Sequence, residues 1–515
     1  MESSRISGIL LHPTSLPGPF GIGDLGAGAY QFVSFLQDSR QQVWQMLPLG
    51  PTGYGNSPYQ TYSAFAGNPL LLSLEQLRAE GLLTADDLLQ VPALPSQRVD
   101  YDAAHAVKEN LLWRAFERFQ GQAAHAQADA LVAFGEGHAD WLDDYALYMA
   151  LKKAHRGAPW NQWGRDIALR EPAALARWRK TLAPQVQFQR FLQYQFFRQW
   201  QSLKTECHRR GIRLFGDVPI FIAHDSADVW AHPELFYLDA LGNPMVVAGV
   251  PPDYFSRTGQ LWGNPLYRWE VMAASGYAWW MQRLRTAQQM VDIIRLDHFR
   301  GFEAYWEVPA ADTTAVNGRW VEGPGVTFFE ELHRVLGALP IVAEDLGLIT
   351  PAVRTLRQRF GFPGMRVLQF AFVDPGTNEH APHNYTWDCV VYTGTHDNNT
   401  SLGWLREVER PESPETRAQI AAERAVALKY MGSNGSQIHW DMIRLALASV
   451  ANISIIPLQD IFGLGQEARM NYPGKAEGNW EWRYTADMLN ADLANRLRDL
   501  TEMYGRVSRK PESET

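Results

Sequence analysis

Eight short apolar runs alternate along this chain with segments of helical periodicity, and this alternation restricts its possible folds more than any other feature. The runs are rich in Ile, Val and Leu, as is typical of parallel strands buried on both faces. They cover residues 8–12, 43–48, 213–218, 292–297, 340–345, 365–370, 390–397 and 453–459. The pattern predicts an α/β fold with a parallel sheet, and eight strands fit a closed (β/α)8 TIM barrel better than an open sheet.

Four of these runs carry an acidic residue at the C-terminal end, namely Asp217, Asp297, Glu344 and Asp397. A buried strand that ends on a carboxylate gives up apolar burial to place a charge at its rim. In a barrel the C-terminal strand ends converge on one face, where the active sites of this fold lie. Clustered carboxylates provide what glycosidic-bond chemistry needs, a proton donor and a nucleophile or base.

Uneven spacing between the runs predicts insertions. We expect the barrel to comprise residues 1–50 and 205–490, with a mostly helical insertion at 51–204 between the second and third strands. A second insertion at 221–267, rich in Pro, Gly and aromatic residues, is expected to cover the site as a loop. Residues 491–515 are expected to form a C-terminal helix and a frayed tail.

The net charge and the cysteine content indicate which partners and which compartment to expect. The formal net charge of −9 argues against a nucleic-acid or anionic-membrane surface, because both attract basic patches. Two cysteines in 515 residues cannot form a disulfide framework, which favours a reducing compartment. No N-terminal signal pattern is present, and no apolar stretch approaches the roughly 18 residues of a membrane helix. We therefore expect a cytoplasmic protein.

One glycine motif is a decoy. Residues 21–26 match the dinucleotide-binding pattern G-x-G-x-x-G, which requires a strand directly before it and an acidic residue at the end of a second strand. Here three prolines separate strand and glycines, and the second strand ends in Pro48. A tight loop leading into the first barrel helix is the better interpretation.

Several segments resemble one family over nearly the whole chain. They are LHPTSLPG at 11–18, GNSPY at 55–59, GDVPIF at 216–221, RLDHFRG at 295–301, AEDLG at 343–347, THDN at 395–398 and RMNYPG at 469–474. Together and in this order they are similar to the amylomaltases, also called 4-α-glucanotransferases or disproportionating enzymes, of glycoside hydrolase family 77.

That resemblance implies roles for the acidic residues. Asp297 would be the nucleophile, Glu344 the general acid/base, and Asp397 a third carboxylate that helps hold and distort the sugar. The family uses a retaining mechanism through a covalent glycosyl-enzyme and needs no cofactor. It usually lacks the C-terminal β-domain of related α-amylases, and this chain also ends soon after its eighth strand.

The residues themselves support this division of roles. Arg295 and Asp297 are two apart, so they share one face of a strand, and the guanidinium can keep the aspartate ionised. Glu344 has no basic neighbour on its strand, so its pKa can rise until it donates a proton. We expect no metal site, because no zinc-type His pair or His/carboxylate cluster stands out.

Further residues are expected to bind the sugar. They are Ser57, Tyr59, Asp217, Asp253, Trp262, Arg295, His298, His396 and Asn471. Trp262 is expected to stack on a glucose ring, and Phe255, in the same lid loop, to exclude water. Tyr54 and Tyr101 occupy positions that the family associates with a secondary glucan groove, or are ordinary packed or exposed tyrosines.

These observations predict an enzyme that moves a segment of an α-1,4-glucan to the 4-hydroxyl of another glucan or of glucose. Its partners would be maltodextrins and other α-1,4-glucans, with no nucleic acid, membrane or obligate protein partner. An α-glucan hydrolase on the same barrel is the nearest alternative, since only the acceptor differs. A non-catalytic glucan-binding scaffold is a second alternative.

Overall fold

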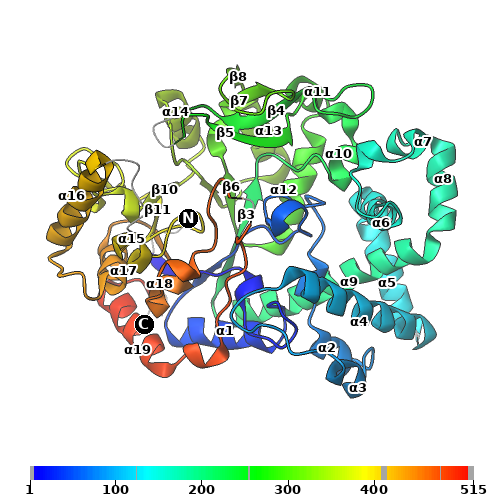
Figure 1. Ribbon diagram of the computed structural model, residues 1–515, viewed down its shortest axis with the longest axis horizontal. Coiled ribbons are helices and arrows are strands. Elements are labelled where there is room, and N and C mark those ends of the chain that lie inside the picture. The colour runs from blue at the N-terminus through cyan, green and yellow to red at the C-terminus, as the bar shows by residue number, and fades with distance from the viewer. Residues whose placement is uncertain (1–4, 123–124, 253–255, 407–413, 476, 508–515) are drawn as a thin grey trace, which may run out of the picture.

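Eight parallel strands form the central sheet of the protein (Figure 1). The computed structural model describes residues 5–122, 125–252, 256–406, 414–475 and 477–507. The strands are β1 (Ile6–Leu10), β2 (Val43–Gln45), β3 (Arg213–Pro219), β6 (Ile293–Asp297), β9 (Ile341–Ala343), β10 (Gly364–Val367), β11 (Cys389–Tyr392) and β12 (Ile453–Pro457). Each overlaps one of the eight runs predicted from the sequence, although several strands are shorter than their runs.

The sheet closes on itself. Its strand order is β10-β11-β12-β1-β2-β3-β6-β9, and every neighbouring pair is parallel. At the seam between β9 and β10, the Ala343 amide donates to the Pro363 carbonyl at 2.9 Å, and the Met365 amide to Asp345 Oδ1 at 2.6 Å. The predicted (β/α)8 barrel is therefore confirmed.

Helices follow or precede the barrel strands in the expected alternation. They are α1 (Ala27–Asp38), α10 (Ala227–Ala231), α11 (Trp269–Ala274), α12 (Ala278–Met290), α13 (Gly325–Leu336), α14 (Pro351–Arg359), α15 (Ser401–Arg406), α16 (Pro414–Met431), α17 (Ile438–Ala448), α18 (Leu458–Phe462) and α19 (Ala491–Met503). The predicted amphipathic pattern shows in α13, which buries Phe328, Phe329 and Leu332 on one face. These positions share a face because the helix repeats every 3.6 residues.

Between β2 and β3 the chain forms a group of helices beside the barrel (Figure 1). They are α2 (Leu74–Ala79), α3 (Ala85–Leu89), α4 (Tyr101–Gln122), α5 (His125–Gly137), α6 (Ala139–Ala154), α7 (Arg165–Ala168), α8 (Pro172–Thr181) and α9 (Ala183–Arg209). Two buried glutamines of α9 bind the backbone of the segment that leads from β2 into these helices. The side-chain amide of Gln193 both accepts from and donates to the Gly67 backbone, and that of Gln199 does the same with Ser73. A buried amide is stable here because its donors and acceptor are paired.

A second, antiparallel sheet extends from the C-terminal ends of β3 and β6 (Figure 1). Its order is β5 (Gln260–Pro265), β4 (Val246–Val250), β7 (Ala304–Pro309) and β8 (Arg319–Glu322). The segment 221–267 was predicted as a loop, whereas the structure builds β4 and β5 within it. Short strands of this kind become stable only by pairing, and β4 pairs with β7, which lies far along the chain.

The glycine motif at 21–26 is the tight loop into α1 that the sequence predicts. Asp24 accepts from the Gly26 amide at 2.9 Å, and α1 begins at the next residue. The buried ammonium of Lys108 in α4 also donates to Asp24, at 3.2 Å. The loop thus ties the helical insertion to the barrel.

Candidate active site

Three of the four acidic residues lie side by side at the C-terminal end of the barrel. Asp217 lies within β3, Asp297 is the last residue of β6, and Glu344 directly follows β9. The register of β3 and β6 pairs Asp217 with Arg295. Because these strands are neighbours in the order β3-β6-β9, the three carboxyl groups come from adjacent positions on the C-terminal face.

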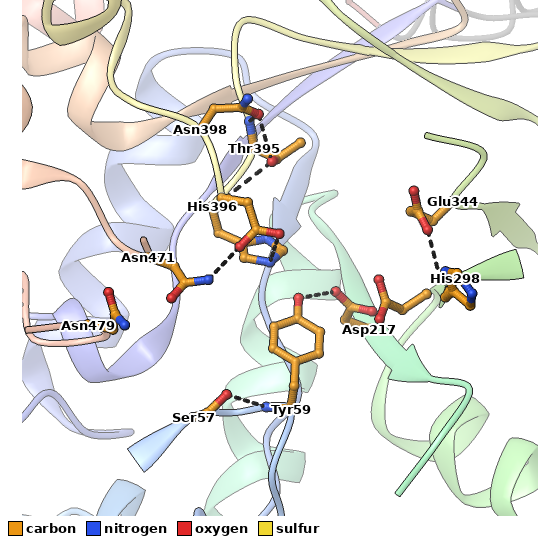
Figure 2. Close-up of polar contacts among 12 residues, drawn as sticks. Ser57, Tyr59, Asp217, His298, Glu344, Thr395, His396, Asn398, Asn471 and Asn479 are labelled. Atoms are coloured by element: carbon orange, nitrogen blue, oxygen red, sulfur yellow. Dashed lines mark hydrogen bonds and ion pairs between the residues drawn. The ribbon is translucent and has the colours of Figure 1, made fainter. Parts of the chain in front are cut away.

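The fourth, Asp397, comes from a loop and not from a strand end. β11 stops at Tyr392, so the strand predicted over 390–397 is shorter than expected. Both the amide and the hydroxyl of Thr395 donate to Asn398 Oδ1, at 2.9 and 2.8 Å, and the Asp397 amide donates to the Thr395 hydroxyl at 3.3 Å (Figure 2). Such local side-chain bonds compete with strand pairing and turn the chain.

Arg295 joins two of the carboxylates. Its Nη1 lies 2.7 Å from Asp297 Oδ1 and 2.7 and 2.9 Å from the two carboxylate oxygens of Asp217. Burial disfavours the charge on Arg295, but Asp217 and Asp297 hold its pKa well above the ordinary value. Burial raises the pKa of Asp217, and Arg295 opposes that rise. The guanidinium is thus the common partner of both acids.

Glu344 is held by two backbone amides. The amide of His298 donates to Glu344 Oε2 and that of Leu346 to Oε1, both at 2.8 Å (Figure 2). Burial raises the pKa of Glu344 to about 8, with the Asp297 charge adding to the rise and Arg295 opposing it. Glu344 is therefore protonated at neutral pH, while Asp297 beside it is ion-paired.

His298 turns the chain directly after Asp297. Its backbone is left-handed, with φ 51° and ψ 50°, which is uncommon for a residue with a side chain. Burial lowers the pKa of His298 to about 4, so the ring is neutral at physiological pH. Trp262 packs edge-on against it with centroids 4.8 Å apart. Among the described residues, no partner bonds the buried Nε2 of His298, which leaves a polar atom for a ligand.

Tyr59 and His396 form a stacked pair. Their ring centroids lie 5.2 Å apart at an interplanar angle of 21°. The Tyr59 hydroxyl donates to Asp217 Oδ2 at 2.8 Å, and its amide donates to the Ser57 hydroxyl at 3.3 Å (Figure 2). Burial, then the charge of Asp217, raises the pKa of Tyr59 well above its usual value, so the hydroxyl stays a donor. The loops after β2 and β11 therefore meet at Asp217.

Asp397 lies beside Asn471 and His396. Asn471 Nδ2 donates to Asp397 Oδ1 at 2.6 Å, and His396 Nε2 lies 3.4 Å from Oδ2. Arg469 Nη2 donates to the Asp397 carbonyl at 2.8 Å, which fixes the backbone of the loop. Figure 2 shows Asn471 on the same side as His396, away from Glu344. The segment around 469–471 thus completes the site from beyond β12.

Not every predicted residue is placed here. Asp253 and Phe255 lie outside the described residues. Tyr54 is 79% exposed, so its ring is open to a ligand. Tyr101 is only 8% exposed, and its hydroxyl donates to the Trp480 carbonyl at 2.9 Å. The two tyrosines predicted as one secondary groove therefore differ, and only Tyr54 presents a surface ring.

A small pocket lies beside His396, between the ends of β1 and β12 and residues 469–482. His12 and Ser15 line it and are buried. Burial, then His396, lowers the pKa of His12 to about 3, so this ring is neutral. Among the described residues, neither Nδ1 of His12 nor the Ser15 hydroxyl has a hydrogen-bond partner, so both can bind water or a hydroxyl ligand.

Three site neighbours were not predicted: His12, Arg469 and Trp480. His12 lies in the motif at 11–18 and Arg469 in the motif at 469–474, and both motifs carry the family resemblance. Their polar side chains within these motifs are the signal that could have identified them. Trp480 packs against both Tyr59 and His396, at 6.0 and 5.9 Å between centroids. In a chain with 19 tryptophans nothing local distinguishes it.

No group of three or more His, Cys, Asp and Glu side chains that could hold a metal ion occurs in the part of the chain that the structure describes. In the same residues no helix is both long and apolar enough to cross a membrane. Cys207 and Cys389 are both free and buried.

Comparison with known proteins gives consistent matches. The family model described as 4-alpha-glucanotransferase matches residues 11–489. The 4-alpha-glucanotransferase of Synechocystis sp. is 53% identical over 510 residues, covering 98% of this chain and 99% of that protein. That of Thermus thermophilus is 50% identical over 509 residues, covering 98% and 100%. The amylomaltase of Streptococcus agalactiae, solved in complex with acarbose, has a TM-score of 0.92 at 37% identity, covering 98% and 100%.

Proposed function

The chain belongs to the 4-alpha-glucanotransferase family, glycoside hydrolase family 77, and from this premise we propose how its carboxyl groups carry out the transfer. The protein is a 4-alpha-glucanotransferase that acts on α-1,4-glucans, and the family mechanism is retaining. One observation carries the residue assignment. Asp297 is ion-paired with Arg295, whereas burial raises the pKa of Glu344 to about 8, so one group is ready to attack and the other to donate a proton.

In the first half of the reaction, Asp297 attacks the anomeric carbon of the donor glucose. The bond from that carbon to the bridging oxygen breaks, and Glu344 gives its proton to the departing 4-hydroxyl. A covalent glycosyl ester on Asp297 results. The two amides that bond Glu344 hold its carboxyl in place for the proton transfer.

In the second half, the 4-hydroxyl of an acceptor glucan attacks the same carbon. Glu344, now a carboxylate, takes the hydroxyl proton, and the bond to Asp297 breaks. Two inversions at one carbon retain the α-linkage. Arg295 stays ion-paired with Asp217 while Asp297 is esterified, so the negative charge that returns to Asp297 meets a guanidinium already in place.

We assign sugar binding to the residues around these two acids. Asp397 holds hydroxyls of the reacting glucose and helps distort it, oriented by Asn471 and by the Arg469 contact to its backbone. His298 and His396 offer ring nitrogens to sugar hydroxyls. For His298 the support is that burial keeps its ring neutral and that its Nε2 has no partner among the described residues. Trp262, packed on His298, is the platform for a glucose ring.

The remaining predicted binding residues act around this core. Asp217 and Ser57 are assigned to hydroxyl binding beside Tyr59, which contacts both. We also assign Asp253 to substrate binding and Phe255 to water exclusion, on sequence grounds, since both lie outside the described residues. Replacing Phe255 with alanine should raise the ratio of hydrolysis to transfer. An unchanged ratio would remove Phe255 from the lid.

We propose that residues 1–50 and 205–490 are the catalytic unit, with 51–204 as a helical subdomain and 221–267 as the segment that covers the substrate. The contact of Trp262, in β5, with His298 at the site supports the covering role. Limited proteolysis tests this division. Cleavage within 221–267 that maltotriose suppresses would support it, and cleavage unaffected by any glucan would count against it.

We further propose that transfer needs no cofactor and takes place in the cytoplasm on maltodextrins. Asp297 and Glu344 supply both the nucleophile and the proton, and the two cysteines are free. Activity should survive dialysis against a chelator. A loss of activity that a divalent ion reverses would show that the reaction needs a bound metal ion.

Incubation with maltotriose tests the function directly. Transfer yields glucose and a ladder of longer maltodextrins, while the total number of reducing ends stays constant. A rise in reducing ends with only shorter products would instead indicate a hydrolase. Acarbose, which the related amylomaltase from Streptococcus agalactiae binds, should inhibit competitively. No conversion of maltotriose or of longer maltodextrins would favour a binding scaffold.

A further inference from the structure

Trp480 occupies a fixed and unusual position behind the site. It is 4% exposed, and its backbone is left-handed with φ 65°, a conformation that bulky residues rarely adopt. Both of its backbone polar groups are bonded. Its amide donates to the Met470 carbonyl at 2.8 Å, and its carbonyl accepts the Tyr101 hydroxyl at 2.9 Å. A strained conformation persists only where the surrounding contacts determine it, and strain of this kind is common beside functional sites.

Three rings meet at this point. The Trp480 ring lies 6.0 Å from that of Tyr59 and 5.9 Å from that of His396, and the latter two stack at 5.2 Å. Each ring therefore contacts the other two. Figure 2 shows that Tyr59 and His396 come from different loops and lie side by side. Trp480 closes the third side of this aromatic cluster, so neither ring can move toward it.

The aromatic cluster is linked to the reacting carboxylates. The Tyr59 hydroxyl donates to Asp217 at 2.8 Å, and Arg295 bridges Asp217 and Asp297. On the other side, His396 Nε2 lies 3.4 Å from Asp397. A displacement of Tyr59 would thus change the hydrogen bonding of Asp217 and, through Arg295, the position of Asp297. Misplacement by about 1 Å can cost about a hundredfold in rate.

We propose that Trp480 is a positioning residue for the transfer reaction, and that Tyr101 of the helical insertion fixes it through the hydroxyl–carbonyl bond. This inference rests on the proposed role of Asp297. Trp480 is buried and acts through Tyr59. Tyr101 then stabilises the barrel site without contacting the substrate. This role explains why a tyrosine at the start of α4 is buried with its hydroxyl bonded to Trp480. The helical insertion therefore contributes to catalysis by supporting this cluster.

Two conservative variants test the proposal. Tyr101→Phe removes only the hydroxyl, and Trp480→Phe reduces the ring while keeping it aromatic. Tyr145→Phe is the matched control, because Tyr145 is a buried tyrosine of the same insertion whose hydroxyl accepts from Gln193 at 3.4 Å. We expect kcat on maltotriose to fall about tenfold in Trp480→Phe and about threefold in Tyr101→Phe, with KM changed less than kcat. The control should stay within about twofold.

Loss of folded protein must be separated from loss of positioning. Rates are therefore normalised to the fraction of native protein from circular dichroism, with melting temperatures measured for all three variants. If normalised rates equal that of the wild type, Trp480 and Tyr101 are structural only, and the proposal is wrong. If Tyr145→Phe loses as much activity as Tyr101→Phe, the Tyr101 hydroxyl has no specific role and the part of the proposal that concerns Tyr101 is wrong.

A donor with a better leaving group adds a second readout. α-Maltosyl fluoride still requires attack by Asp297, but fluoride departs without a proton from Glu344. In the initial burst of fluoride release, which reports the first half of the reaction alone, we expect the Trp480→Phe defect to persist and the defect of Glu344→Gln to be largely relieved. Relief of the Trp480→Phe defect would place its effect on proton donation and would overturn the proposed route through Tyr59.

A double-mutant cycle with Tyr59→Phe identifies the route. If Trp480 acts by holding the Tyr59 hydroxyl on Asp217, Trp480→Phe should cost little further in the Tyr59→Phe background. Losses that multiply would mean independent effects and contradict the proposal. A separate Asp297→Asn variant tests the proposed function itself. Wild-type activity in that variant would refute the role of Asp297 whatever the cycle shows.

Discussion

Nη1 of Arg295 lies 2.7 Å from Oδ1 of Asp297, two residues further along the same strand. Alternate residues of a strand share a face, so this ion pair follows directly from the sequence spacing. The same nitrogen also contacts Asp217 of the neighbouring strand. One guanidinium thus pairs with two carboxylates, and the buried charge of Asp217 would not be stable without it.

Substitution of Asp297 by asparagine should abolish transfer without unfolding the protein. Asparagine keeps an oxygen for Arg295 but cannot form the glycosyl ester, so we expect kcat on maltotriose to fall by about 10⁴-fold or more. Chromatography of maltodextrin products measures the rate. Asp239→Asn, in an exposed turn, is the matched control and should retain activity. A loss below tenfold would mean that Asp297 is not the nucleophile.

The pH dependence of kcat/KM should have a basic limb set by Glu344. Burial raises the pKa of Glu344 to about 8, and the group must be protonated to act as an acid, so activity should fall above that pH. Initial rates on maltotriose across the pH range measure this limb. With α-maltosyl fluoride the Glu344→Gln variant should lack it. A basic limb of unchanged midpoint in that variant would assign the titration to another group.

Ionisation of Glu344 should lower the free energy of unfolding of the protein at alkaline pH. The pKa of Glu344 is about 8 in the folded state and 4.5 ordinarily, so the folded protein binds the proton more tightly. The contribution to stability is complete below pH 4.5 and is lost as pH rises towards 8, by an amount on the order of a few kcal/mol. Glu344→Gln should therefore raise the melting temperature more above pH 8 than below pH 4.5. Equal changes at both pH values would contradict the raised pKa.

Asp345, next to Glu344, should matter for stability and not for chemistry. Its Oδ1 accepts the Met365 amide at 2.6 Å across the β9–β10 seam, and its Oδ2 lies 3.4 Å from Arg357 and 3.6 Å from Arg366. Its carboxylate fills the space beside Gly364, where a Cβ would meet Oδ2 at 2.3 Å. Asp345→Ala should lower the free energy of unfolding by about 3 kcal/mol, since a buried pair loses one partner.

Urea denaturation measures that change, and Asp345→Asn is its control. Asparagine retains an acceptor for the Met365 amide and should cost less. The activity of the folded fraction should stay within about twofold of wild type in both variants. If Asp345→Ala unfolded at the wild-type urea concentration, the seam would be held by the strand pairing alone.

Tyr54 should affect long glucans and not short ones. Its ring is 79% exposed, so removing it leaves the fold and the reacting carboxyls untouched. Tyr54→Ala should weaken binding of a long linear glucan several-fold, about the worth of one stacked ring, with unchanged kinetics on maltotriose. Affinity electrophoresis in amylose measures this. Leu89→Ala, at an equally exposed residue of α3, is the control, and identical mobility of both variants would exclude a surface site at Tyr54.

Much of the barrel was predictable because its signals are local. Apolar runs and their positions gave all eight strands, and spacing alone placed Arg295 beside Asp297. Two features could not be predicted, and each has a physical reason. The strand at 390–397 was overextended because Asn398 captures the amide and hydroxyl of Thr395, a competition that residue preference does not show. The small sheet was missed because β4 is stabilised by β7, from a distant segment.

The sequence by itself determined the eight barrel strands, the acidic residues near their ends and the Arg295–Asp297 pair, because each depends on residues a few positions apart. Only the tertiary structure decided the pKa of Glu344, since burial is set by everything packed around the carboxyl. It also decided that Tyr101 is buried and that Trp480 packs on Tyr59 and His396. Those contacts join four segments far apart in the chain, and such proximity exists only once the barrel and its helical insertion have packed together.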